Sequence, residues 1–182
     1  MRWWELTWPE FKKVDKTVAL LPTGIVEAHG PHLPLGTDAL MATYIAEEAA
    51  KRTNALLLPT VWYGNTYVLD KFPGTISISN ETLYMLYRDI FREVARNGVK
   101  YLVVINGHGG NVDALNMAAK DVAKETNLTI IIINWWIDLG SPLCVFVLSL
   151  VHLWETHPSL GFHWSLGGCP VTLGTGLEFE TL

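Results

Sequence analysis

Short, uninterrupted apolar runs alternate along the chain with longer stretches in which apolar residues recur every three or four positions. The runs are rich in aliphatic and β-branched residues and are bounded by Pro, Gly or Asn, which is typical of buried strands. The periodic stretches each carry one apolar face, which indicates amphipathic helices. The pattern predicts strands over 17–25, 55–64, 100–107 and 128–136, helices over 37–54, 80–98 and 111–126, and a loop with a short extended segment over 70–79.

The predicted helices differ in how clearly their ends are marked. The helix over 80–98 is the clearest, because its regular apolar face ends at an Asn-Gly pair typical of a helix C-terminus. The helix over 37–54 begins at Thr37 or Asp38, either of which is a candidate cap. The helical period places its larger apolar residues on one face, the expected core face: Leu40, Met41, Tyr44, Ile45 and Ala49.

The order of these elements predicts an α/β fold. Fully apolar strands that alternate with helices favour a parallel sheet covered on both faces. In such folds, sites form at the carboxyl ends of the strands. Two loops rich in polar and glycine residues, 24–38 and 106–111, follow the first and third predicted strands. Right-handed crossovers place both loops at the same edge of the sheet, so we expect one shared site.

Composition narrows the function classes. A chain of 182 residues is long enough for one domain with a substantial core, and no internal repeat or low-complexity linker divides it. The net charge of −5 provides no basic surface for nucleic acid, so a small-molecule partner is expected. Two cysteines are too few for a disulfide scaffold and favour a reducing, cytoplasmic location. The N-terminus lacks a signal-peptide pattern, and the longest apolar run, 143–154, is too short to span a bilayer.

The C-terminal stretch departs from the rest of the chain. All 13 Lys and Arg residues lie at or before Lys124, and the 58 residues after it contain none. Average usage would give about six. We therefore treat 1–182 as a single domain whose residues from about 140 to 182 are atypical, either truncated or read in a shifted frame. Resequencing the coding region tests this hypothesis, and an intact reading frame would exclude the shift.

The first loop concentrates groups that bind metals. Glu27 and His29 lie two residues apart, so their side chains point to the same side of an extended segment. Asp38 opens a predicted helix, whose N-terminus favours an ionised carboxylate. Mixed histidine and carboxylate ligands suit zinc, manganese or iron. The structural alternative is a capping Asp, a surface Glu and two loop histidines.

The second loop reads NGHGGN over 106–111, with His108 between glycines. Glycines permit left-handed backbone or close approach, and their amides could stabilise an oxyanion. His108 is either a metal ligand or a stacked loop residue. The loop could also cradle a phosphate, although it matches no complete nucleotide-binding motif. Together the two loops supply most of a two-metal site with a bridging carboxylate, which would activate water for hydrolysis of an amide or formamide.

Three segments of the sequence resemble the creatininase family: LPTGIVEAHGPHLPLGTD, FPGTISIS and NGHGGN. The resemblance covers about residues 1–139 and implies a three-layer α/β/α metal-dependent amidohydrolase that assembles as a homohexamer. Carried over position by position, it implies that two divalent ions (Zn, Mn or Fe) are bound, with Asp38 bridging them. The implied metal ligands are Glu27, His29, Asp38 and His108. His32, in the same motif, is expected to support a ligand from behind.

The chain departs from the family pattern at two places. A later family motif, H-A-G-x-x-E-T-S, supplies a further metal-binding Glu, whereas this chain has HLWETHPSL over 152–160. Glu155 is the candidate acid there, either as a proton shuttle or simply as a surface residue. Family members often have a His shortly before FPGT, and this chain has none at that place. Trp135 and Trp136, at the end of the fourth predicted strand, could wall a pocket or belong to the core.

The leading functional prediction is a metal-dependent amidohydrolase that cleaves a non-peptide C–N bond of a small cyclic amide or formamide. The resemblance implies substrates that include creatinine, a formamidopyrimidine nucleotide and a peptide bond of mycofactocin maturation. An alternative is an inactive relative that binds metal only in part and has an assembly role. A phosphate-binding α/β protein is the third hypothesis, and it predicts nucleotide binding that survives chelation.

Overall fold

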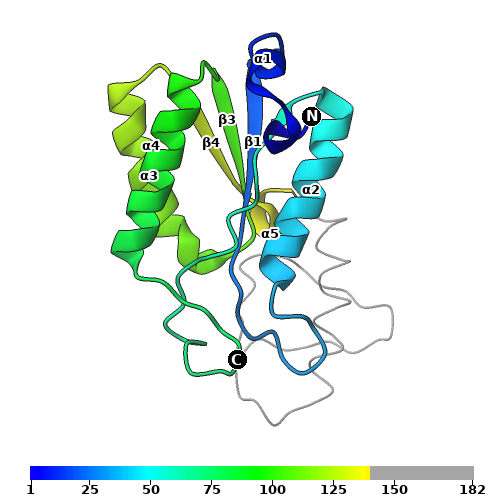
Figure 1. The fold of residues 1–182 in the computed structure, drawn as a ribbon. Coiled ribbons are helices and arrows are strands. Elements are labelled where there is room, and N and C mark those ends of the chain that lie inside the picture. The colour runs from blue at the N-terminus through cyan, green and yellow to red at the C-terminus, as the bar shows by residue number, and fades with distance from the viewer. Residues whose placement is uncertain (140–182) are drawn as a thin grey trace. The chain divides into compact units, whose positions relative to one another are not determined.

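The computed structural model describes residues 1–139, which form an α/β unit (Figure 1). None of the helices in this part of the chain is long and apolar enough to cross a membrane. The elements follow in the order η1 (Trp3–Glu5), α1 (Trp8–Phe11), β1 (Val18–Thr23), α2 (Thr37–Thr53), β2 (Leu56–Leu57), α3 (Asn80–Arg96), β3 (Tyr101–Asn106), η2 (Gly109–Asn111), α4 (Val112–Glu125), β4 (Thr129–Asn134) and α5 (Trp135–Asp138).

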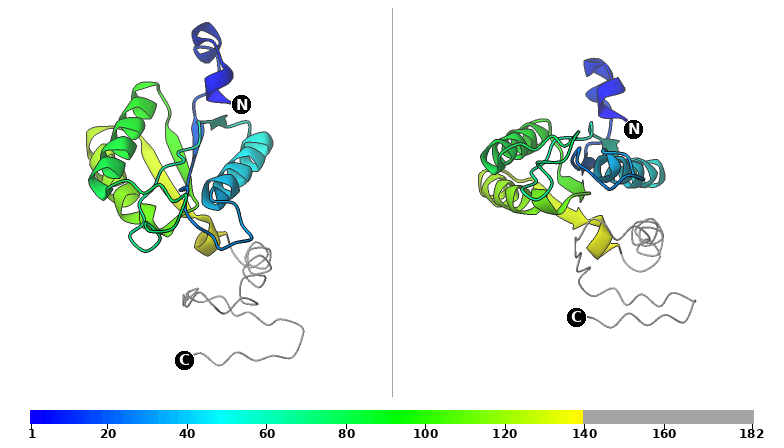
Figure 2. Two further views of the ribbon diagram at one scale, coloured as in Figure 1. Left: turned by 60° about the horizontal axis from the view of Figure 1, so that its bottom comes forward. Right: turned by 90° about the horizontal axis from the view of Figure 1, so that it is seen from below.

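The sheet has four parallel strands in the order β2-β1-β3-β4, which confirms the predicted parallel α/β fold. β1 and β3 pair along their whole length, from Val18 opposite Tyr101 to Thr23 opposite Asn106. Their carboxyl ends therefore lie side by side at the centre of the sheet. Helix α2 lies on one face of the sheet, and α3 and α4 pack together on the other (Figure 2).

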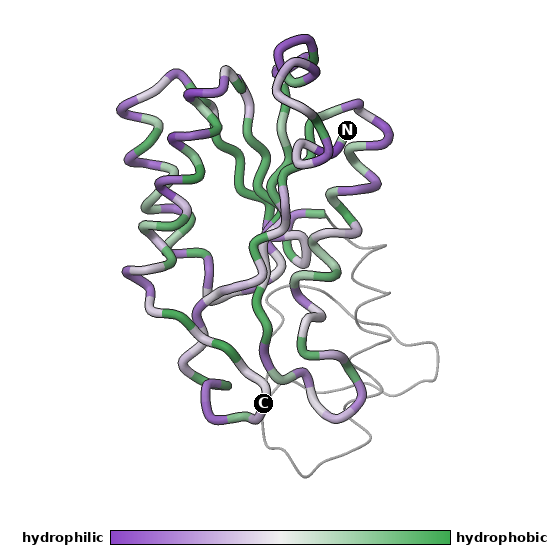
Figure 3. The backbone as a smooth tube through the Cα atoms, viewed as in Figure 1, coloured by the Kyte–Doolittle hydropathy of each residue, from purple (hydrophilic) through white to green (hydrophobic). Residues whose placement is uncertain are grey.

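The main core lies between the sheet and the α3–α4 pair. The strands at the centre are hydrophobic (Figure 3), and every residue of β1 after Val18 is buried. Helix α3 begins where the Ser79 hydroxyl accepts a hydrogen bond from the Thr82 amide at 3.1 Å. Its predicted apolar face is confirmed, because the buried residues recur at the helical period: Leu83, Tyr87, Phe91 and Val94.

The predicted core face of α2 is wrong. Leu40 and Tyr44 are 47% and 64% exposed, whereas the buried residues are all alanines: Ala39, Ala42, Ala46 and Ala50. The reason is the short distance between this helix and the sheet. A Cβ atom at Gly24 would lie 2.4 Å from the Ala39 amide nitrogen, so helix and strand end already touch through backbone. Only small side chains fit between surfaces that approach so closely.

Two further boundaries differ from the predictions. The second strand pairs only at Leu56–Leu57: the Leu58 amide still donates to the Leu20 carbonyl at 2.9 Å, but Pro22, whose amide would be the next of β1 to face this strand, has no hydrogen to donate. Beyond it, Val61 forms an isolated bridge with Thr23. The fourth strand ends at Asn134, and Trp135 and Trp136 begin the short helix α5 with their rings edge to face at 6.2 Å. Trp135 is buried, which agrees with a core role.

The alanine face of α2 gives a direct test of the packing. We expect Ala46→Leu to lower the free energy of unfolding by about 1–3 kcal/mol, because a larger side chain must displace the helix from the sheet. The matched control Leu40→Ala, on the exposed side of the same helix, should change it by no more than about 0.5 kcal/mol. Urea unfolding of the two variants measures both values, and equal losses would contradict the close packing.

Candidate metal centre

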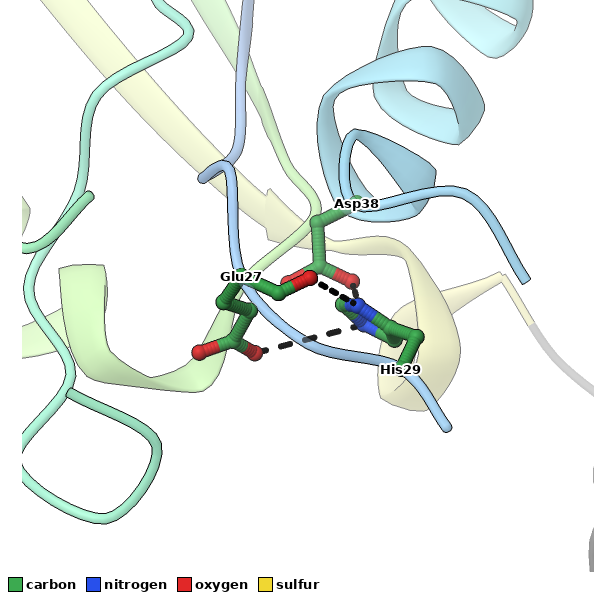
Figure 4. A group of neighbouring side chains, drawn as sticks. All are labelled: Glu27, His29 and Asp38. Carbon is green, nitrogen blue, oxygen red and sulfur yellow. Dashed lines mark hydrogen bonds and ion pairs between the residues drawn. The ribbon is translucent and has the colours of Figure 1, made fainter. Parts of the chain in front are cut away.

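The two polar loops meet at the carboxyl ends of β1 and β3, as their positions after neighbouring strands predicted. Glu27 and His29 follow β1, Asp38 is the second residue of α2, and His108 follows β3. Figure 4 shows Glu27, His29 and Asp38 turned toward one another. One donor atom from each of these three lies within 4.8 Å of the others, a spacing that suits a metal ion.

Asp38 stands between the two histidines. Its Oδ1 lies 2.9 Å from Nε2 of His29, and its Oδ2 lies 2.9 Å from Nδ1 of His108. Each carboxylate oxygen thus faces a different imidazole ring. Asp38 could therefore offer one oxygen beside each histidine to a bound metal ion.

The outer nitrogen of each histidine is held by a backbone carbonyl. His29 Nδ1 lies 3.1 Å from the Glu27 carbonyl oxygen, and His108 Nε2 lies 2.8 Å from the Asn65 carbonyl oxygen. A carbonyl only accepts hydrogen bonds, so both outer nitrogens carry the hydrogen. The Asp38 carboxylate also only accepts, so in the metal-free protein each inner nitrogen donates a hydrogen to it, and loss of that proton would leave a lone pair directed at the site. Metal-binding histidines are oriented in this way in proteins.

Glu27 adds a second carboxylate to this group. Its side chain is buried, and Oε1 lies 3.3 Å from His108 Nδ1 and 4.0 Å from His29 Nε2. Its Oε2 is also buried and has no hydrogen-bond partner in the part of the chain that the structure describes. An unpaired buried carboxylate oxygen is costly, and a cation would offset that cost. The two carboxylates and the two inner nitrogens therefore fit a divalent metal.

The structural alternative for the first loop does not hold. The N-cap of α2 is Gly36, and neither Thr37 nor Asp38 caps the helix through its side chain. Thr37 instead donates its hydroxyl to the Pro34 carbonyl at 2.6 Å. Glu27, only 1% exposed, is not a surface acid. Both carboxylates are directed inward, toward the histidines.

In the absence of metal, a proton takes the place of the cation. Burial disfavours the charged ring of His108, yet hydrogen bonds to Asp38 and Glu27 raise its pKa to about 10. Burial likewise opposes the charge on His29, but Asp38 still raises the pKa of that ring. Burial also acts against ionisation of Asp38, and the two histidines nevertheless lower its pKa. The carboxylates thus stabilise positive charge at this point.

The glycines of NGHGGN allow backbone to approach closely. A Cβ at Gly107 would lie 2.3 Å from the Asp38 carbonyl oxygen, and one at Gly110 would lie 2.0 Å from the Asn65 carbonyl oxygen. Neither glycine has a positive φ, so close approach explains them and left-handed backbone does not. The Gly107 amide donates to the Thr23 carbonyl at 2.8 Å, which removes it from the predicted oxyanion donors.

Three buried asparagines support the loops, and the sequence analysis did not single them out: Asn65, Asn106 and Asn111. The Asn106 side chain accepts from the His108 amide at 3.1 Å and donates to the His108 carbonyl at 2.8 Å. Two of the three asparagines flank His108 in NGHGGN. Polar residues at the end of a buried strand are the feature of the sequence that could have identified them. Asn65 and Asn111, however, also bond to segments distant in sequence.

Of the two residues predicted to assist the ligands, only His32 lies in the part of the chain that the structure describes. His32 lies on the loop before α2 and is exposed, and the Glu27 carbonyl already orients His29. Its supporting role stays a prediction. Glu155, the predicted proton shuttle, lies outside the described residues, as does the rest of the stretch from 140 to 182.

The sequence and the fold match those of a known protein family. Residues 4–163 match the family described as Creatininase: Creatinine amidohydrolase. The chain belongs to the creatininase family. The resemblance predicted from three motifs is thereby confirmed, and the match extends past residue 139, where the motif resemblance ended.

Curated relatives have several activities. The chain is 38% identical over 168 residues to the mycofactocin precursor peptide peptidase of Mycobacterium ulcerans (strain Agy99), which covers 87% of this chain and 60% of the relative. It is 31% identical to the creatinine amidohydrolase of Pseudomonas putida, over 78% of this chain and 60% of the relative. It is also 31% identical to a formylaminopyrimidine nucleotide deformylase of Methanothermobacter marburgensis, over 74% and 62%. The chain spans about three fifths of the length of these relatives.

Solved structures of creatininase share the fold. A manganese form superposes with a TM-score of 0.73 at 29% identity, covering 81% of this chain and 63% of that chain. A mutant of the Zn-Zn type superposes with a TM-score of 0.68 at 29% identity, covering 81% and 62%.

The glycine contacts predict different outcomes for two adjacent positions. We expect Gly110→Ala to lower the free energy of unfolding by about 1–3 kcal/mol, because its methyl group meets the Asn65 carbonyl and the His108 ring. Gly109→Ala is the matched control, since no atom lies within 4 Å of its added Cβ, and should change stability by about 0.5 kcal/mol or less. Chemical denaturation compares the two, and a tolerated Gly110→Ala would contradict the close approach.

The raised pKa of His108 predicts how the stability of the metal-free protein depends on pH. A group whose pKa rises on folding stabilises the protein below its unfolded pKa, and that contribution is lost as pH climbs through the folded value. The free energy of unfolding should therefore fall between about pH 6.5 and about pH 10. The fall should be on the order of 1.4 kcal/mol for each unit by which folding raises the pKa of His108.

Comparison with His108→Gln isolates this effect from other groups that titrate in the same range. Unfolding of both proteins in urea at several pH values gives the difference between them. That difference should shrink toward high pH, because the variant has no imidazolium to lose. A constant difference between the two proteins would show that His108 does not hold a proton in the metal-free site.

Proposed function

We propose that this protein is a metal-dependent amidohydrolase that cleaves a non-peptide C–N bond of a small cyclic amide or formamide. The observation that carries the proposal is the position of Asp38 between two inward-facing histidine nitrogens. The buried, partnerless oxygen of Glu27 supports it. Family membership supports the reaction class, because the family is described as creatinine amidohydrolase.

The metal ligands of the proposed enzyme are Glu27, His29, Asp38 and His108, with Asp38 as the bridge. Two divalent ions bound there would lower the pKa of a water molecule and polarise the substrate carbonyl. Zinc, manganese or iron suits the mixed nitrogen and oxygen donors, and the manganese and zinc forms of solved relatives agree with this choice. The backbone carbonyls of Glu27 and Asn65 keep the two histidines in the binding tautomer.

The remaining parts of the proposal concern proton transfer and assembly. We propose that Glu155 moves a proton to the leaving nitrogen and that His32 supports the first loop. The family resemblance supports a homo-oligomer, with a hexamer as the implied form. The low cysteine content supports a cytoplasmic location.

A small heterocyclic amide is the proposed substrate class, by analogy with relatives. One solved creatininase mutant is complexed with creatine, and one curated relative is a deformylase of a pyrimidine nucleotide. Peptide cleavage is the second candidate. The observation that favours it is the higher identity to the mycofactocin peptidase, 38% compared with 31% for creatinine amidohydrolase.

Metal content and hydrolysis together test the proposal. The purified protein should contain close to two equivalents of Zn, Mn or Fe and hydrolyse at least one of creatinine, a formamidopyrimidine nucleotide or a mycofactocin-type peptide. Asp38→Ala should lose metal and lower hydrolysis by more than about 100-fold, since loss of a supporting partner alone costs up to that factor. Asp113→Ala, which removes an exposed Asp from the first turn of α4, is the matched control and should keep both.

Three results would separate the alternatives. At most one equivalent of metal with no hydrolysis of any of the three substrates would indicate the inactive relative. Cleavage of the peptide alone would indicate that the activity is peptide cleavage, the second candidate, and not hydrolysis of a cyclic amide or formamide. Nucleotide binding that survives chelation, without hydrolysis, would indicate the phosphate-binding hypothesis.

A further inference from the structure

The ring of His108 is oriented by one backbone group, the carbonyl of Asn65. This carbonyl accepts the hydrogen of Nε2 at 2.8 Å, and the opposite nitrogen, Nδ1, then faces Asp38 and Glu27. If the carbonyl turned away, Nε2 would lose its partner in a buried position, and only the contacts of Nδ1 with Asp38 and Glu27 would orient the ring. The direction of the Asn65 carbonyl therefore decides whether His108 presents a lone pair to the site.

Asn111 holds Asn65 on one side. Its side-chain oxygen accepts from the Asn65 amide at 3.4 Å, and its side-chain nitrogen donates to the Gly24 carbonyl at 3.0 Å. The same nitrogen donates to the Asn106 side chain at 3.4 Å. A single buried amide thus ties the end of β1, the loop at 64–66 and the end of β3 to one another.

Ser77, in the FPGTISIS segment, holds the residue that follows Asn65. Its hydroxyl accepts from the Thr66 amide at 2.9 Å and donates to the Thr66 carbonyl at 2.9 Å. The Thr66 amide belongs to the same planar peptide group as the Asn65 carbonyl. A hydroxyl that fixes one end of this plane therefore fixes the direction of the other end, which points at His108. The Asn65 side chain also donates to the Ile78 carbonyl at 2.7 Å.

We propose that Ser77 and Asn111 are positioning residues that hold the Asn65 carbonyl against His108 and so keep its Nδ1 turned toward the metal ligands. This assigns a role to the FPGTISIS segment, which contributes no donor atom to the metal cluster. Ser77 acts through the peptide group between Asn65 and Thr66, and it is an exposed residue. The inference rests on the proposed function in one respect, the role of His108 as a ligand.

Ser77→Ala and Ser79→Ala form a matched pair for the test, because both remove a hydroxyl from the same segment. Ser79 caps α3 and has no bond to Thr66. We expect Ser77→Ala to weaken the binding of Zn²⁺ by about 10-fold and Asn111→Ala by about 10- to 100-fold, the range for loss of an outer-shell partner. Ser79→Ala should stay within about 2-fold. Competition with a chelating indicator, on the full chain, measures the dissociation constants.

The tautomer of His108 provides a readout that simple loss of stability would not change. In the zinc-loaded wild-type protein, labelled with ¹⁵N at histidine, nuclear magnetic resonance should show Nε2 of His108 protonated and Nδ1 bound to metal. Ser77→Ala should speed the exchange of the Nε2 hydrogen with water, whereas Ser79→Ala should not. The Ser77 variant removes only an exposed side chain, so it keeps the test available even where Asn111→Ala does not fold.

The inference is overturned if Ser77→Ala and Ser79→Ala bind Zn²⁺ equally well, or if Nδ1 of His108 carries the hydrogen in the zinc-loaded protein. Failure of the proposed function is distinct, because the wild-type protein would then hydrolyse none of the three substrates, and in the extreme case it would also bind no Zn²⁺. In that case the inference is tested by the rate at which the Nε2 hydrogen of His108 exchanges with water in the metal-free protein. Equal rates in wild type and Ser77→Ala would overturn the inference.

Discussion

The close approach of helix α2 to the ends of β1 and β3 is the constraint on which the site depends. Backbone meets backbone here, since a Cβ at Gly24 or Gly107 would overlap the first turn of the helix. The alanines that face the sheet permit this distance along the rest of the helix. The result is that Asp38, in the first turn of α2, reaches both His29, after β1, and His108, after β3.

This geometry creates a buried group of carboxylates that stabilises positive charge. Two carboxylates, Glu27 and Asp38, lie beside inward-facing nitrogens and have little contact with water. In the metal-free protein, the proton on His108 neutralises part of this charge, which is why its pKa rises despite burial. A divalent ion bound there would neutralise the same carboxylate charge and would form bonds with several donor atoms at once. The surrounding asparagines and carbonyls hold the rings, so the donor atoms are oriented before a metal arrives.

Family membership and the local geometry support the same chemistry at different levels of detail. The match over residues 4–163 establishes the family, whose curated members act on a cyclic amide, a formamide and a peptide. The names of these three relatives all indicate cleavage of a C–N bond next to a carbonyl. The residues that distinguish the substrates are therefore expected around the metal ligands and not among them.

The sequence by itself determined the parallel α/β fold, the helix α3 and the four candidate ligands. Apolar runs and the helical period carry local information, and the rule that strand ends share one edge brought the two loops together. Only the tertiary structure decided that alanines form the buried face of α2, that the second strand pairs at two residues, and that Asn65 orients His108. These features depend on distances between segments far apart in sequence. The helical period shows which residues share one face of a helix, but it does not show how closely that helix packs against its sheet.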